Sequence, residues 1–262
     1  MKHTLHVTLI IFLLFLTAHF IGLSVTDRYI GGTELPLGIE RPEVNEEVGY
    51  VPILVAIIIA TAIALLLIKF SALKLWKLWF FIAIMYSLLI SFGAFIHHYI
   101  ALFLAIGFAL LKILRPTAIL HNFSELFIYG GLAGIFVPIL NLFAIVVLLI
   151  IVSLYDMIAV WKTKHMIKMA KFQAKSKVFA GLMIPYSKNK VAILGGGDIG
   201  FPLLFSGVIM KTSGLISAYI VSFFAGLSLL ALLLLSEKKK FYPAMPFLTA
   251  GCFIGWAISL LI

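Results

Sequence analysis

Three acidic residues, Glu125, Asp156 and Asp198, lie inside apolar stretches of the sequence. An acid at the centre of a bilayer costs at least about 2.5 kcal/mol, so it is expected to serve a function or to have a partner. Asp156 is six residues before Lys162, and Asp198 is eight residues after Lys190. At about 1.5 Å per residue, these spacings predict depths of about 9 Å and about 12 Å in two consecutive, antiparallel helices. Two carboxyl groups at matched depth can meet.

A pair of carboxyl groups in a medium of low dielectric has a defined chemistry. The two groups cannot both ionise, so they share one proton and titrate as a pair. The charged member can take a proton from water while the protonated member donates a hydrogen bond to a substrate carbonyl, as in aspartic proteases. The alternatives are a buried salt bridge, for which we find no lysine or arginine deep in any predicted span, and a proton relay in a transporter.

Glu125 is predicted to have a structural role instead. It lies near the start of its predicted span, directly after the sequence HNFS. Ser124 or Asn122 can cap this helix, and an acid in the first turn is favourable for the helix dipole.

The composition predicts the elements that must hold these acids. Of 262 residues, 63% are hydrophobic and 11% are charged, against about 25% charged in soluble domains. The apolar runs fit membrane-spanning helices of about 20 residues. We predict an all-α polytopic membrane protein with nine spans, 5–23, 50–69, 76–95, 98–114, 119–137, 139–161, 191–210, 214–235 and 244–262. The alternative for the first span is a signal peptide, although no clear cleavage site follows it.

The chain is predicted to form one integral-membrane domain, 1–262. Spans one to six occupy 1–161, a basic loop occupies 162–190, and spans seven to nine occupy 191–262. With a cytoplasmic N-terminus and an external C-terminus, only Arg28, Arg41 and Lys211 of the 20 basic residues lie outside the cytoplasmic segments. The net charge of +10 therefore indicates a membrane surface and not a nucleic acid. The basic loop is either an amphipathic helix on anionic lipid, with its apolar positions between 167 and 178, or a solvated segment.

Glycines and prolines flank the predicted aspartate pair. Gly195, Gly196 and Gly197 remove side chains where the seventh span begins, so another backbone can approach closely. Pro243 and Pro246 predict a non-helical segment at 242–245, with Pro246 near the first turn of the last span. The free backbone groups of this segment, those of Ala244 above all, could pair with an extended substrate by strand addition.

These motifs together resemble those of a known family. The sequences YD at 155–156, GGGD at 195–198 and PAMP at 243–246 are similar to the YD, GxGD and PAL motifs of the presenilin and signal peptide peptidase family, in the same order and on the same spans. The resemblance implies a presenilin-like fold, with Asp156 and Asp198 as catalytic aspartates and substrate contacts from Tyr155, Gly197, Pro243, Ala244 and Met245. Met245 replaces the leucine of the family, which conserves volume.

The sequence thus predicts an intramembrane aspartic endopeptidase that cleaves transmembrane helices of other proteins. By resemblance it is a small microbial, presenilin-like protein of the cell membrane, with its active site toward the cytoplasm. The partners expected are transmembrane peptides or proteins and the lipid bilayer, without nucleic acid and without an evident obligate subunit.

No cofactor and no metal are expected, because Cys252 is the one cysteine and His97–His98 is the one histidine pair. The main alternative is a proton- or cation-coupled transporter or leak channel that uses the same aspartates, but we find no internal repeat. A prepilin-peptidase-like enzyme and a non-catalytic scaffold are the remaining alternatives.

Overall fold

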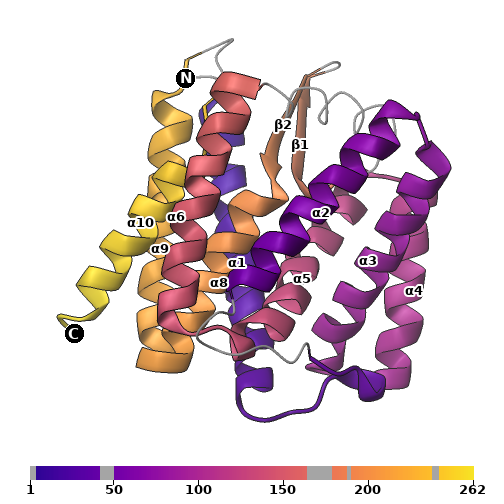
Figure 1. The fold of residues 1–262 in the computed structure, drawn as a ribbon, viewed down its shortest axis with the longest axis horizontal. Helices are drawn as coiled ribbons and strands as arrows, with labels where there is room; N and C mark the ends of the chain where they lie inside the picture. The colour runs from indigo at the N-terminus through magenta and orange to yellow at the C-terminus, as the bar shows by residue number, and fades with distance from the viewer. Residues whose placement is uncertain (1–3, 42–49, 164–178, 188–189, 238–241) are drawn as a thin grey trace.

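The computed structural model describes residues 4–41, 50–163, 179–187, 190–237 and 242–262. These residues form nine α-helices and one β-hairpin (Figure 1). The helices are α1 (Leu5–Ile30), α2 (Tyr50–Lys69), α3 (Leu73–Gly93), α4 (His98–Leu114), α5 (Ala118–Phe136), α6 (Leu142–Ile158), α8 (Gly196–Ser213), α9 (Leu215–Leu235) and α10 (Met245–Ser259). The hairpin pairs β1 (Gly181–Ser187) with β2 (Lys190–Gly195), and a π-helical turn, Ala159–Thr163, extends α6.

The helices form a bundle in which α1, α5 and α8 lie between two outer pairs (Figure 1). On one side α9 packs on α10, and on the other side α3 packs on α4. The chains of α3 and α5 approach so closely that a Cβ atom on Gly131 would lie 1.9 Å from the backbone oxygen of Ser87. This approach brings α5 next to both α3 and α4.

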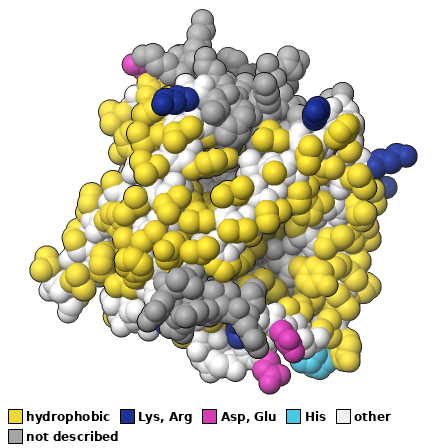
Figure 2. Space-filling model, in the orientation of Figure 1, with side chains coloured by type: hydrophobic (Ala, Val, Ile, Leu, Met, Phe, Trp, Pro, Cys, Tyr) yellow, Lys and Arg dark blue, Asp and Glu magenta, His cyan; other side chains and the backbone are white. Residues whose placement is uncertain are grey.

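The surface is that of a membrane protein. Six of the helices are long and apolar enough to cross a bilayer, and α4 and α10 are shorter apolar helices. Large apolar side chains are exposed over a broad band (Figure 2), for example Ile58 at 67% and Phe103 at 78%. The predicted class, an all-α multi-pass membrane protein, is confirmed.

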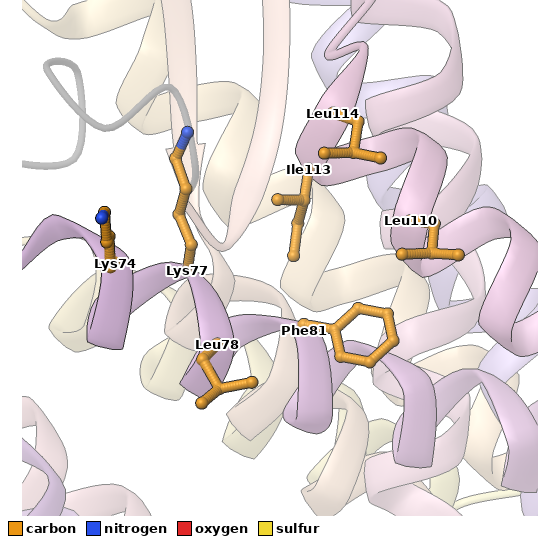
Figure 3. A pocket seen from close by; sticks show the side chains of 7 residues that line it. All are labelled: Lys74, Lys77, Leu78, Phe81, Leu110, Ile113 and Leu114. Atoms are coloured by element: carbon orange, nitrogen blue, oxygen red, sulfur yellow. The ribbon is translucent and has the colours of Figure 1, made fainter.

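A groove lies between α3 and α4 (Figure 3). It is lined by Lys74 and Lys77 and by apolar side chains of both helices, including Phe81 and Leu114.

The breaks between the predicted spans agree with the structure in two places. His97 and His98 lie exposed at the turn between α3 and α4. A short helical turn, Val137–Ile139, separates α5 from α6, and the side chain of Asn141 caps α6 by accepting a hydrogen bond from Ala144 N at 2.7 Å. At the last break, α10 begins at Met245 with Pro246 in its first turn. Residues 242–244 are therefore non-helical as predicted, whereas Met245, which was predicted to be non-helical, belongs to the helix.

The start of the predicted seventh span is wrong. Residues 190–195 form strand β2 and not helix, and α8 begins only at Gly196. Ala192 and Leu194 are buried on one face of this strand, while Val191 and Ile193 are 44% and 60% exposed on the other. Because both faces are apolar, the sequence lacks the alternation that marks a half-buried strand. The predicted amphipathic segment within 167–178 lies outside the described residues.

Candidate active site

The last turn of α6 carries Asp156. Its side chain is half-buried, and its Oδ2 atom accepts a hydrogen bond from Met245 N at 3.1 Å. One turn earlier, the hydroxyls of Ser153 and Thr249 are 2.8 Å apart, which makes a second polar link between α6 and α10. The end of α6 is therefore fixed against the beginning of α10.

The first turn of α8 carries Asp198, also half-buried. A negative charge in this position is stabilised by the helix dipole. The carboxyl group also forms a hydrogen bond with the backbone of Gly195, the N-terminal cap residue of α8. A Cβ atom on Gly195 would lie 3.1 Å from the Oδ2 atom of Asp198, so the glycine leaves the room that the carboxyl group occupies.

The structure brings the two aspartates together. Asp156 and Asp198 come from different helices and are close enough to interact electrostatically. Among the described residues, neither forms a salt bridge with a lysine, arginine or histidine. Two carboxyl groups that interact electrostatically without a cation are expected to share a proton.

The other residues predicted to contact substrate lie around this pair. Tyr155 is 38% exposed beside Asp156, and Gly197 is exposed beside Asp198. Pro243 and Met245 are buried, and Ala244 is half-buried. The carbonyl of Ala244 already accepts hydrogen bonds from the first turn of α10, from the backbone N–H groups of residues 247 and 248. Strand addition at Ala244 would therefore require that turn to open.

The predicted position of Glu125 in the first turn of its helix, with Ser124 or Asn122 as the cap, is wrong. Helix α5 begins at Ala118, and its cap is Thr117, whose hydroxyl accepts a hydrogen bond from Leu120 N at 3.3 Å. Glu125 lies two turns further along and is 1% exposed. Its carboxylate forms a buried salt bridge with Lys112 of α4.

The burial of Lys112 was not predicted: it lies in the last turn of α4, yet its side chain is only 1% exposed. A signal for this burial is present in the sequence. Ala101, Ala105, Ala109 and Lys112 follow one another at helical spacing, and all four are buried. Small residues at this spacing mark a closely packed helix face, and Lys112 continues that face.

Polar side chains of α5 also bind β1, the first strand of the hairpin that precedes α8. Glu125 Oε2 accepts a hydrogen bond from Gly181 N at 3.0 Å, and His121 Nε2 lies 2.7 Å from Gly181 O. The amide of Asn122 bonds both backbone groups of Met183, accepting from N at 2.8 Å and donating to O at 2.7 Å. The predicted cap residue Asn122 therefore belongs to a contact between α5 and β1.

No group of three potential metal ligands occurs within the described ranges. The polar groups that the described residues place at the site are the two carboxyl groups and the backbone around them.

Comparison with known proteins identifies the family of this chain. The family described as signal-peptide peptidase, presenilin aspartyl protease matches residues 33–262, and the chain belongs to this family. A comparison with curated proteins gave no match.

Two solved structures share the fold, both described as a presenilin family intramembrane aspartate protease. The one in space group C222 has a TM-score of 0.69 and 19% identity, and covers 97% of this chain and 98% of its own. The one in space group P2 has a TM-score of 0.67 and 18% identity, with 96% of each chain covered. The protein is thus a presenilin-family intramembrane aspartate protease, as the sequence motifs predicted.

Proposed function

We propose that Asp156 and Asp198 are the catalytic pair, and that the enzyme hydrolyses peptide bonds in transmembrane helices of membrane-protein substrates. The observation that supports this proposal is the electrostatic interaction between the two aspartates, which lie at the end of α6 and at the start of α8. Because hydrogen bonds to Met245 and Gly195 orient them, the two carboxyl groups are positioned before substrate arrives.

The reaction needs only these two groups and a water molecule. The ionised carboxylate removes a proton from water, whose oxygen adds to the carbonyl carbon of the peptide bond. The protonated carboxyl group donates its hydrogen bond to the carbonyl oxygen. When the tetrahedral intermediate collapses, the C–N bond breaks and the amine nitrogen takes up a proton from the carboxyl group that had received it from water.

The β-hairpin offers a place where an unwound substrate could bind. Strands in a two-stranded antiparallel sheet each have an outer edge, and α5 covers the outer edge of β1 through Gly181 and Met183. Among the described residues, no hydrogen bond reaches the outward backbone groups of Val191 and Ile193 in β2. A substrate strand added to this edge by β-augmentation would lead directly toward Asp198, three residues beyond the end of β2.

We infer further that the active site faces the cytoplasm. Basic side chains gather mostly at the end of the molecule that carries the hairpin, while acidic and histidine side chains gather mostly at the opposite end (Figure 2). This distribution supports the orientation that the positive-inside rule gives.

The test uses purified enzyme in lipid or detergent with a generic single-span peptide. We expect the wild type to cut within the apolar segment, and Asp156→Asn and Asp198→Asn each to abolish cutting while their thermal stability stays that of the wild type. An Asp198→Asn variant that cuts as the wild type does would contradict the pair. Proton or cation flux in liposomes, lost in the same variants while no peptide is cut, would point instead to transport.

A further inference from the structure

The pairing of β1 with β2 determines which backbone groups of β1 point away from the hairpin. In an antiparallel pair, residues alternate between those bonded to the partner strand and those directed outward. Gly181 and Met183 face Gly195 and Ile193, and their own N–H and C=O groups bond α5 instead of β2. Pro185 occupies the next outward position, where its missing N–H leaves no donor to satisfy.

Three side chains of α5 replace a neighbouring strand along this edge. We call His121, Asn122 and Glu125 the α5 polar row. Together they bond all four outward groups of Gly181 and Met183 at distances of 2.7–3.0 Å. A carbonyl only accepts hydrogen bonds, so the Nε2 atom of His121 carries the proton that Gly181 O receives.

The α5 polar row is itself fixed from behind. Glu125 is 1% exposed, and a buried carboxylate is stable only when it is paired and hydrogen-bonded. Lys112 supplies the opposite charge, and the hydroxyl of Tyr129 donates a further hydrogen bond. Lys112 bonds Oε1 of Glu125, and Tyr129 and Gly181 N both bond Oε2.

The same contacts reach the first turn of α8. Gly181 lies opposite Gly195, and Gly196 N donates to the carbonyl of residue 180 at 3.2 Å, so β1 holds the residues that lead to Asp198. The hydroxyl of Tyr129 would lie 3.1 Å from a Cβ atom on Gly196. Two elements that contact Glu125, β1 and the Tyr129 ring, therefore both pack against the start of α8.

We propose that the α5 polar row is a built-in substitute strand that keeps the hairpin assembled before substrate binds and closes the outer edge of β1. His121, Asn122 and Glu125 are then positioning residues, and Lys112 supports them by neutralising Glu125. The substrate strand can add only to β2, the edge nearest Asp198; this last statement rests on the proposed function.

Hydrogen exchange of the enzyme without substrate tests the assembled hairpin. In Asn122→Leu, which removes both bonds to Met183, we expect the segment 179–187 to exchange at least about tenfold faster than in the wild type. Ser124→Ala is the matched control, because Ser124 is buried in the same helix but donates only to Leu120 O within α5. Equal protection in Asn122→Leu and the wild type, or equal loss in the control, would overturn the proposal.

Steady-state cleavage separates this role from a role in the chemical step. If substrate must assemble the hairpin on binding, the apparent KM equals its intrinsic value divided by the assembled fraction, while kcat is retained. We expect a KM about tenfold higher in Asn122→Leu, with kcat within about twofold of the wild type. A lower kcat at unchanged KM would overturn the proposal.

A second pair of variants tests Glu125 without leaving a buried charge unpaired. Lys112→Met/Glu125→Gln and Lys112→Met/Glu125→Leu carry the same charge and differ in whether residue 125 can accept hydrogen bonds. We expect the glutamine variant to keep the protection of 179–187 and the leucine variant to lose it; equal exchange would contradict the substitute strand. Asp198→Asn should be inactive while the segment 179–187 keeps its normal protection. Activity in this variant would contradict the catalytic proposal without affecting the proposal for the α5 polar row.

Discussion

The protein contains two groups of acids at membrane depth, and their surroundings differ. Glu125 is fully buried, and it is bonded to a lysine, a tyrosine hydroxyl and a backbone N–H. Asp156 and Asp198 are half-buried and interact electrostatically, with backbone contacts and no salt bridge among the described residues. Depth in the membrane therefore does not distinguish a structural acid from a reactive one. The neighbours do, since a buried carboxylate that is paired with a cation and bonded by a hydroxyl and an N–H group is held in a fixed, ionised state.

The largest effect on stability is expected at Glu125. In Glu125→Ala, Lys112 remains as an unpaired buried charge, and the free energy of unfolding should fall by about 3–5 kcal/mol. Lys112→Met/Glu125→Leu removes the unpaired charge and should be more stable than Glu125→Ala, with a remaining loss of about 1–3 kcal/mol from the hydrogen bonds of Tyr129 and Gly181. Denaturation in a fixed detergent measures both variants. If the single and the double variant are equally unstable, the cost comes from packing and not from the uncompensated charge.

Asp198 should show the opposite behaviour, with a large effect on activity and a small one on stability. Asp198→Glu keeps the charge but moves the carboxyl group by about one bond length. We expect cleavage to fall by about 10²-fold, because catalytic groups tolerate displacements of less than about 1 Å. Thermal unfolding serves as the control. Full activity of Asp198→Glu would mean that the position of this carboxyl group is not critical.

A substitution at the close contact between α3 and α5 should have an effect of intermediate size on stability. In Gly131→Ala, the new methyl group would overlap the backbone oxygen of Ser87, and we expect a loss of about 1–3 kcal/mol. Gly107→Ala in α4 meets no atom within 4 Å and should be neutral or stabilising by up to about 1 kcal/mol. Equal unfolding temperatures for the two variants would show that α3 and α5 can separate without cost.

The smallest effect is expected one turn from Asp156. Thr249→Val removes the hydroxyl that bonds Ser153 but keeps the shape of the side chain. The loss of one hydrogen bond should cost about 0.5–1.5 kcal/mol and lower cleavage only severalfold. A loss of activity as large as that of Asp198→Glu would place Thr249 within the catalytic machinery itself.

Much of this arrangement could be predicted from the sequence, for physical reasons. The spans follow from apolar runs, and the breaks at His97–His98 and Asn141 follow from polar residues within those runs. The proximity of Asp156 and Asp198 was predicted from their depth on consecutive helices. The residues between Lys190 and Asp198, which that prediction treated as helix, form strand β2 up to Gly195.

The contact between α5 and β1 could not be predicted in the same way. Strand β2 is apolar on both faces, so it resembles the start of a helix. Glu125 and Lys112 are 13 positions apart on different helices, and their pairing depends on which faces of α4 and α5 meet. The small residues of α4 indicate its packed face but not its partner.

Binding of a hydroxyl-bearing transition-state analogue of peptide hydrolysis tests the catalytic pair most directly, because it does not depend on the choice of substrate. The affinity would be measured by calorimetry for the wild type, Asp156→Asn and Asp198→Asn in the same detergent. Such analogues bind about 10²–10⁸-fold more tightly than substrates when the catalytic groups are in place. We expect each single substitution to weaken binding by at least about 10²-fold. Unchanged affinity in either variant would contradict the assignment of Asp156 and Asp198 as one catalytic unit.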